Sequence, residues 1–325
     1  MKTNNKLHPW YVTGFTDSEG SFSCYIQRTS NLKDKITVSL EYKVTQKTHS
    51  DSVLHEIQNY FSAGSVVIDN RKTDTKKYHL TNLELILKKL IPHFEAYPCL
   101  TSKNLNFKDF KQIATMLSQK KHFTSQGVEE IISIISNMNT KRSFKDKYDY
   151  CNLSLDLNRE GRINSILPPS WVQGFLDGEA TFYIHLTSLP DHVEDDNVTE
   201  VYTIQEETKK DHICNPSLEV AQNSHDVSIL LGLQTFFKGG YIKPKYNVNS
   251  LEECLQSRSV NRFIIRTPLD TILKFLSEYP LKTRKLLDFQ DWLRIIKLKK
   301  QNAHKTTKGL NNMWTIKNQM NSNRR

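Results

Sequence analysis

The sequence predicts an α+β protein made of two copies of one α-β-β-α-β-β-α repeat, each with an open antiparallel sheet. Two observations support this prediction. Three blocks of sequence occur twice, in the same order, in the two halves of the 325-residue chain. In each half, segments with helical spacing of apolar residues flank segments in which apolar and polar residues alternate. We therefore expect two pseudo-symmetric halves, each with one sheet face packed on helices and one polar face.

The first repeated block is the clearest. Residues 7–22 read LHPWYVTGFTDSEGSF, and residues 167–182 read LPPSWVQGFLDGEATF without a gap between the two. Pro9 and Pro169 suit the first turn of a helix, where the missing N–H of proline costs nothing. Each predicted helix runs through a phenylalanine and ends at a turn rich in glycine and aspartate.

The other two blocks extend the repeat through both halves. YKVTQKT at 42–48 resembles LEVAQNS at 218–224. YPCLTSKNLNFKDFKQI from Tyr97 aligns without a gap with YPLKTRKLLDFQDWLRI from Tyr279. The spacing between equivalent residues grows from block to block, which indicates insertions in the second copy, mainly in a polar loop around 190–215. The predicted boundaries are an N-terminal repeat at 1–142, a linker at 143–166 and a C-terminal repeat at 167–325.

Local patterns predict the remaining elements of the first copy. Residues 21–27 and 36–44 alternate between apolar and polar side chains, which is typical of half-buried strands. Further along the chain we expect a helix near 50–61, strands near 65–71 and 76–80, and helices near 83–91, 104–119 and 124–138. The second copy repeats this order.

The chain is basic, with 45 Lys and Arg against 35 Asp and Glu and a formal net charge of +10. This excess favours a polyanionic partner. No run approaches the ~18 apolar residues that span a bilayer, and MKTNNKLHPW at the N-terminus lacks the character of a signal or transit peptide. Five cysteines without a CxxC pair argue against a disulfide framework or a zinc site and fit a reducing compartment.

Two equivalent carboxylates are the strongest chemical signal. Glu19 and Glu179 each end one of the repeated helices, and Gly14 and Gly174 allow those helices to approach closely. If the helices pack together, the two carboxylates converge and must share a proton, pair with cations or hold metal ions. Oxygen ligands in an open site suit Mg²⁺. For a single copy, an ordinary polar helix end at the surface explains the same residues.

WYVTGFTDSEG and WVQGFLDGEA resemble the two signature motifs of single-chain, double-motif LAGLIDADG homing endonucleases. The resemblance covers nearly the whole chain and is strongest to fungal mitochondrial intron-encoded enzymes. It implies a monomer whose two saddle-shaped sheets straddle the major groove of a long, asymmetric DNA target. It also implies that the signature helices form the interface between the repeats. Such an enzyme makes a metal-dependent double-strand break with 3′ overhangs, and the resemblance implies a mitochondrial location.

The same resemblance assigns roles to particular residues. Glu19 and Glu179 match the metal ligands, with two or three divalent ions (Mg²⁺, with Ca²⁺ as a substitute that does not support cleavage) between them. Ser18 and Gly178 match residues that offer backbone carbonyls to the metals. Asp17 and Asp177, which precede them, match structural residues that hold the helix ends.

Four more residues match the family pattern around the scissile phosphates. Gln46 and Gln222 match the polar residue that positions the nucleophilic water, and Lys103 and Lys285 match a peripheral basic residue. The chemistry requires such groups, because displacement at phosphorus needs metals on the attacking and leaving oxygens and a cation for the developing charge. The alternative for either glutamine is an ordinary polar residue at a strand end, and the alternative for either lysine is a solvated helix residue. Ala180 departs from the pattern, since the equivalent residue of the first copy is Gly20.

The polar faces of the two sheets are the predicted DNA-reading surfaces, because a two-stranded ribbon fits the major groove. In the first copy the expected contacts are Ser21, Ser23, Tyr25, Gln27, Thr37, Ser39, Glu41 and Lys43. In the second copy they are Thr181, Tyr183, His185, Thr187, Ser217 and Glu219. Basic residues expected to read guanine or hold phosphates are Arg71, Lys72, Lys76, Lys77, Lys243, Lys245, Arg262 and Arg266.

Two other functions stay open on the sequence. The basic surface also fits an RNA maturase that assists splicing of its host intron, although the presence of both glutamates favours cleavage. A two-carboxylate glycosidase is the weaker alternative, because the chain is basic and has no evident aromatic sugar platform.

Overall fold

The computed structural model describes residues 6–29, 35–154, 167–187, 213–244, 260–267 and 269–324. They divide into two compact units: Met1–Ala180 with Glu219–Arg284, and Thr181–Leu218 with Lys285–Arg325. The second repeated helix therefore belongs to the same unit as the first. The boundaries at 142 and 166 stay predictions about the repeats.

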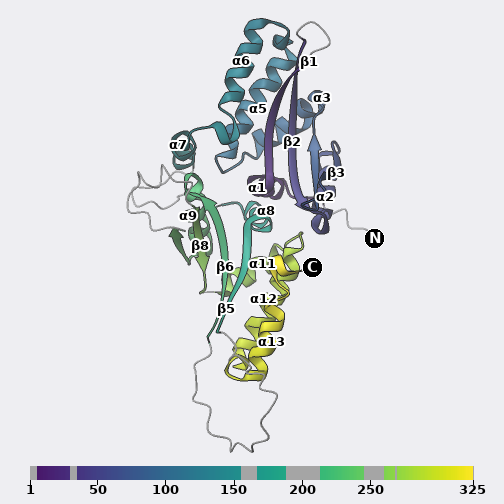
Figure 1. Ribbon diagram of the computed structural model, residues 1–325. Coiled ribbons are helices and arrows are strands. Elements are labelled where there is room, and N and C mark those ends of the chain that lie inside the picture. Colours follow the sequence, from purple (N-terminus) through teal and green to yellow (C-terminus); the bar gives the residue numbers. More distant parts are fainter. Residues whose placement is uncertain are drawn as a thin grey trace, which may run out of the picture. The chain divides into compact units, whose positions relative to one another are not determined.

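The elements follow the predicted order (Figure 1). The first copy contains α1 (Pro9–Glu19), β1 (Gly20–Thr29), β2 (Lys35–Lys47), α2 (Ser52–Phe61), β3 (Ser65–Asn70), β4 (Thr75–Leu80), α3 (Leu83–Leu85), α4 (Ile91–Ala96), α5 (Lys103–Ser118) and α6 (Ser125–Ser136). α7 (Phe144–Ser154) follows. The second copy contains α8 (Pro169–Glu179), β5 (Ala180–Leu186), β6 (Cys214–Asn223), α9 (Val227–Phe237), β7 (Tyr241–Pro244), β8 (Val260–Ile265), α11 (Leu269–Glu278), α12 (Lys285–Lys300) and α13 (Thr307–Lys317).

Each copy forms one four-stranded sheet, with the strand orders β1-β2-β4-β3 and β5-β6-β8-β7. In the first sheet, the antiparallel register pairs Phe22 with Tyr42 and Tyr25 with Ser39. Antiparallel partners share a face, so apolar and polar side chains separate onto opposite faces as predicted. The alternation in β5 is equally clear, because Ala180, Phe182, Ile184 and Leu186 are buried and the residues between them are exposed.

Phe22 marks the centre of the core under the first sheet. It is fully buried, and its ring lies 5.1–5.5 Å from those of Tyr42, Phe94, Phe107 and Phe110. These rings come from β2, α4 and α5, so one aromatic cluster joins the sheet to the helices that cover it. Burying a phenylalanine stabilises a fold by about 1.5–3 kcal/mol.

Two segments differ from the prediction. The helix expected near 83–91 is interrupted by a π-helical turn at Ile86–Leu90, directly before α4. Pro92 explains the irregularity, since it has no N–H to continue the α-helical pattern of hydrogen bonds. α7 lies inside the predicted linker at 143–166, of which residues 155–166 are outside the described part. The sequence did not predict α7, because its apolar residues show little helical periodicity.

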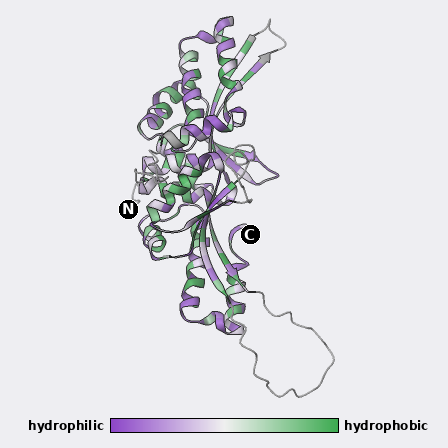
Figure 2. Ribbon diagram, turned by 90° about the vertical axis from the view of Figure 1, so that its left-hand side faces the viewer, coloured by the Kyte–Doolittle hydropathy of each residue, from purple (hydrophilic) through white to green (hydrophobic). Residues whose placement is uncertain are grey.

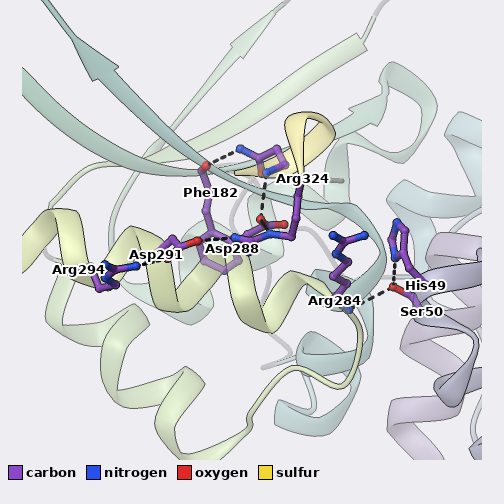
Figure 3. A network of polar contacts seen from close by, with 9 residues as sticks. His49, Ser50, Phe182, Arg284, Asp288, Asp291, Arg294 and Arg324 are labelled. Carbon is purple, nitrogen blue, oxygen red and sulfur yellow. Dashed lines mark hydrogen bonds and ion pairs between the residues drawn. The ribbon is translucent and has the colours of Figure 1, made fainter. Parts of the chain in front are cut away.

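The ends of both copies repeat the same local contacts. The side-chain amide of Asn139 donates to the carbonyl of Phe22 at 3.0 Å, and that of Asn321 donates to Phe182 at the same distance. Both asparagines have a left-handed φ of 55°. In the second unit Arg324 also bridges Asp288 and Asp291 on α12 (Figure 3). The gapless alignment of the third repeated block therefore holds into the last turn of the described chain.

Hydrophilic and hydrophobic segments alternate along the helices and strands (Figure 2). Among the described residues, none of the helices combines the length and the apolar character needed to cross a bilayer.

A buried histidine joins three segments of the first copy. His93 of α4 contacts the hydroxyl of Tyr60 through Nδ1 at 2.9 Å and the hydroxyl of Thr13 through Nε2 at 3.3 Å. Thr13 gives its own proton to the carbonyl of Tyr97 at 2.8 Å. His93 must therefore donate from Nε2 and accept at Nδ1, which is the neutral imidazole. Burial lowers the pKa of His93 to about 3.

We predict that His93→Gln flattens the pH dependence of stability. Between the unfolded pKa of about 6.5 and the folded value, only the unfolded chain binds a proton at this position. Acidification below pH 6.5 thus removes up to about 1.4 kcal/mol of unfolding free energy per pH unit from the wild type, and not from the variant. Urea denaturation at pH 7, 6, 5 and 4 measures the difference. His55→Gln on the exposed face of α2 is the control, and an unchanged slope in His93→Gln contradicts the prediction.

Candidate active site and nucleic-acid interface

The site begins with the close packing of α1 and α8. A Cβ atom added to Gly14 would lie 2.1 Å from the carbonyl oxygen of Trp171, and one added to Gly174 would lie 2.3 Å from that of Tyr11. Real Cβ atoms do not approach backbone oxygens this closely, so only glycine fits at both crossings. The predicted packing of the two helices through these glycines is confirmed.

Two buried aspartates lock this pair of helices. Asp17 accepts hydrogen bonds from the backbone of Leu100, the backbone and hydroxyl of Thr101, and the indole N–H of Trp171 at 2.8 Å. The indole comes from the opposite helix. Burial raises the pKa of Asp17, although these donors and the nearby ammonium of Lys103 partly offset the effect.

Asp177 repeats the arrangement in the second copy. It accepts from the backbone of Lys282, the backbone and hydroxyl of Thr283, and the phenol of Tyr11 at 2.7 Å. Burial and the adjacent carboxylate raise the pKa of Tyr11 well above its usual value, so the phenol stays protonated and donates. Tyr11 and Trp171 occupy equivalent positions, and each crosses to the other helix. The structural role predicted for Asp17 and Asp177 is confirmed.

The two candidate metal ligands lie where these helices end. Glu19 and Glu179 are the last residues of α1 and α8, and both are half-buried. A Cβ on Gly178 would lie 2.4 Å from the Cβ of Ser18 and 3.1 Å from the Cγ of Glu19. The end of α8 therefore lies against Ser18 and Glu19. The second carboxylate, that of Glu179, belongs to the residue directly after Gly178.

Lys103 reaches the same place from α5. Its ammonium donates to the carbonyl of Thr16 at 2.9 Å and to that of Ser18 at 3.3 Å. A cation at this position stabilises the carbonyls at a helix C-terminus. Lys285 begins α12 in the second unit as Lys103 begins α5. Gln46 and Gln222 lie at the ends of β2 and β6. The catalytic roles expected of Lys103, Lys285 and the two glutamines stay predictions.

The structure explains the departure at Ala180. Gly20 and Ala180 both have extended backbones, with φ of −86° and −70°, and both donate to the carbonyl four residues earlier. At Gly20 an added Cβ would lie 2.6 Å from the branched methyl of Thr16. The residue equivalent to Thr16 is Leu176, which has no branch at Cβ. The second turn therefore accommodates an alanine.

Glu41 organises the polar face of the first sheet. Its carboxylate lies 2.7 Å from the ammonium of Lys77, 3.5 Å from the imidazole of His79 and 3.4 Å from the phenol of Tyr25. Partial burial opposes ionisation, but the hydrogen bond and charge of Lys77 outweigh it and lower the pKa of Glu41. Tyr25, Gln27, Thr37 and Ser39 are exposed, and Ser21, Ser23 and Lys43 are half-buried. Arg71 and Lys72 are exposed in the turn between β3 and β4.

Lys76, one of the basic residues expected to contact DNA, lies off this polar face. The register pairs it with Gln46 on the opposite side of the sheet, where its ammonium lies 2.6 Å from Asp51. Lys76 alternates with Lys77, so only one of the two lysines can face the polar side.

In the second copy the exposed polar residues of β5 are Thr181, Tyr183 and His185, while Thr187 is half-buried. Ser217 was expected at the surface but is buried, with 1% of its surface exposed. Glu219 is half-buried and lies 3.9 Å from the exposed Arg262. Lys243 pairs with Arg262 in the register.

Arg266 lies over the ring of Tyr241 at 6.0 Å. Lys245 is outside the described residues.

Three further residues of the polar face in the first sheet were not predicted from the sequence. His79 and Val67 share this face with Lys77 through the pairing of β3 with β4, and Asp69 lies 3.8 Å from Lys77. The alternation of β4 could have identified His79 once Lys77 was placed. Val67 is 38% exposed and offers an apolar surface of the kind that contacts thymine methyl groups.

The sequence pattern of the family described as LAGLIDADG endonuclease matches residues 12–114 and 172–296. The chain belongs to this family. The two matches lie in the two copies of the repeat, and each includes most of one signature helix, up to its last residue. The family therefore accounts for both halves of the chain.

Known relatives agree with this assignment. The chain is 27% identical over 327 aligned positions to "Probable intron-encoded endonuclease 2" of Neurospora crassa, covering 97% of this chain and 65% of that protein. It is 25% identical to the I-LtrWI LAGLIDADG homing endonuclease in a crystal structure with target DNA, with a TM-score of 0.77 and 98% of each chain covered. It is 28% identical to I-GzeII in complex with its DNA target, with a TM-score of 0.73, covering 98% of this chain and all of that one.

We predict that Gly174→Ala destabilises the protein by about 1–3 kcal/mol or more, since overpacking against a backbone oxygen forces the helices apart. Gly14→Ala should destabilise the protein by a similar amount. Guanidinium denaturation measures the free energy of unfolding, with Ser133→Ala on the exposed side of α6 as a control expected within about 0.5 kcal/mol of the wild type. Wild-type stability in either glycine variant would show that the helices are not in backbone contact.

Proposed function

We propose that the chain is a site-specific homing endonuclease that makes a double-strand break with 3′ overhangs in a long, asymmetric DNA target. One observation supports this proposal most directly: α1 and α8 pack through Gly14 and Gly174 and end in the equivalent carboxylates of Glu19 and Glu179. The cofactor we propose is Mg²⁺, and the site of action a mitochondrion. The name of the Neurospora crassa relative, "Probable intron-encoded endonuclease 2", supports an intron origin.

The donors at this junction fit a hard divalent cation. Two carboxylates and the carbonyls of Ser18 and Gly178 offer only oxygen, the ligand that Mg²⁺ and Ca²⁺ prefer. When bound, such an ion supplies a Lewis acid and an activated water for phosphodiester hydrolysis. Lys103 lies beside the carbonyl of Ser18 and supplies a positive charge for the scissile phosphate. In this proposal Gln46 and Gln222 orient water, and Lys285 repeats the role of Lys103.

The polar sheet faces supply the DNA contacts. On the first sheet, Glu41 holds Lys77, His79 and Tyr25 in one network, so these side chains are ordered before DNA arrives. Ordered donors and acceptors suit base readout in the major groove, while exposed basic residues in turns, such as Arg71 and Lys72, suit phosphates. The maturase alternative gains no comparable support from the relatives, whose names describe endonucleases.

We predict that Glu19→Gln and Glu179→Gln each abolish double-strand cleavage while leaving specific DNA affinity within about tenfold of the wild type. Glutamine keeps the shape of the side chain and loses the charge that a metal ion requires. A library of intron-insertion-site duplexes with Mg²⁺ and end mapping provides the target and the assay, and binding is measured with Ca²⁺. Full cutting of both strands by either variant would remove these carboxylates from the site.

A second prediction separates phosphate contacts from base contacts. Lys72→Ala should weaken binding to every sequence and lower the salt slope by about one unit, whereas Lys77→Ala should relax preference at one or two positions. Wild-type binding to scrambled duplex should weaken by about 10³–10⁵ between 50 and 200 mM salt if ~6–10 phosphates are contacted. Salt titrations in Ca²⁺ on cognate and scrambled duplexes measure both effects. Equal affinity for both duplexes at every salt would refute sequence recognition, and tighter binding to intron RNA would favour the maturase.

A further inference from the structure

Asp226 is a buried carboxylate outside the site described above. It follows β6 in a short turn before α9 and is 6% exposed. It accepts from the backbone N–H of Ser102 at 2.7 Å, from the hydroxyl of Ser102 at 3.1 Å and from the thiol of Cys151 at 2.9 Å. His225 lies 3.2 Å away. Burying an unpaired charge is very unfavourable, and these four donors compensate the charge of the Asp226 carboxylate. We call this carboxylate and its four donors the anchor.

The anchor acts on the start of α5. Ser102 is the N-cap of α5, and Lys103 is its first residue. The backbone of Ser102 is thus fixed by Asp226 one residue before the lysine whose ammonium reaches Thr16 and Ser18. A carboxylate is favourable at a helix N-terminus, where backbone N–H groups point outward. Here that carboxylate comes from the second copy of the repeat, far along the chain from Ser102.

α7 completes the anchor. Cys151 donates to Asp226, and the ring of Phe144 meets the ring of His225 edge-on at 5.6 Å. α7 also contacts α5, because Asn104 donates to the hydroxyl of Tyr150. Three segments therefore meet at one carboxylate, and any change in its bonding reaches the first turn of α5.

The residue equivalent to Asp226 in the first copy is a serine, which has no charge to anchor the next helix. Ser50 corresponds to Asp226 when the second repeated block is extended past its last residue, and Arg284 corresponds to Ser102 in the third block. The hydroxyl of Ser50 accepts from the backbone N–H of Arg284 at 3.2 Å and lies 3.0 Å from Nδ1 of His49, the residue equivalent to His225 (Figure 3). The first copy thus has a neutral hydroxyl at the position where the second copy has a charged carboxylate surrounded by four donors.

We infer that Asp226 is a positioning residue that fixes Lys103 through the start of α5, and that it serves the cleavage of one DNA strand only. The inference rests on the proposed function, because it assigns Lys103 to one of two strand cleavages. Ser50 is its weaker counterpart for the other strand. A small displacement of a positioned group can cost about 10²-fold in rate, so loss of the anchor should appear as unequal strand cleavage.

The test is strand-resolved cleavage by the full chain on a duplex labelled differently on each strand. Lys103→Ala first identifies the strand that depends on Lys103. Asp226→Asn, which keeps shape and loses charge, should slow that same strand at least about tenfold under single turnover and leave the other within about twofold. DNA affinity in Ca²⁺ should stay unchanged. Ser50→Ala should slow only the opposite strand, and by less.

Asp109→Asn is the matched control. Asp109 lies on α5 and pairs with Arg142, away from the start of the helix, so its loss should lower stability without changing the ratio of the two strand rates. Asp226→Ser, which copies Ser50, replaces Asp226→Asn if that variant does not fold. Hydrogen exchange at the amides of residues 103–106 gives a readout without cleavage and should rise in the Asp226 variant.

The outcomes separate the two hypotheses. Wild-type cutting with an unchanged strand ratio in Asp226→Asn, or equal slowing of both strands, overturns the role of Asp226. Unchanged exchange at the start of α5 overturns it as well. If the wild type cuts neither strand of any duplex, the proposed function fails, and increased exchange in the variant then still supports the anchor itself.

Discussion

The rest of the structure depends on the backbone contact between α1 and α8. Gly14 and Gly174 let each helix lie against a carbonyl of the other, at distances that no side chain permits. Tyr11 and Trp171 then cross between the helices to opposite aspartates. The last residues of the two helices, Glu19 and Glu179, come close together only because the helices pack this tightly. The packing at the two glycines therefore determines where the carboxylates of the site lie.

Asp17 and Asp177 carry this constraint from the helices to the chain segments before α5 and α12. Each binds two successive backbone N–H groups of such a segment, at Leu100 and Thr101 or at Lys282 and Thr283. The segment before α5 leads directly to Lys103. A buried carboxylate that accepts four donors is therefore both a structural bond and a means of placing a basic group beside the helix end.

Duplication explains the shared plan, and later divergence explains the differences. The left-handed residues Lys120 and Asn302, and the asparagines at the ends of the copies, occupy equivalent positions in one gapless alignment. Ala180 with Leu176, and Asp226 against Ser50, show where equivalent positions have changed together with their neighbours. Such differences agree with the proposed function, in which the two halves recognise unlike half-sites and act on separate strands.

The sequence by itself determined the duplication, the order of the elements, the alternating strand faces and the equivalence of Glu19 with Glu179. These features depend on residues close together in the chain or on repetition, so local patterns contain them. Only the tertiary structure decided that Ser217 is buried, that Lys76 pairs with Asp51, that α7 forms, and that Asp226 anchors α5. These outcomes depend on contacts between distant segments, and in such contacts burial and hydrogen bonding are settled by neighbours that no local pattern specifies.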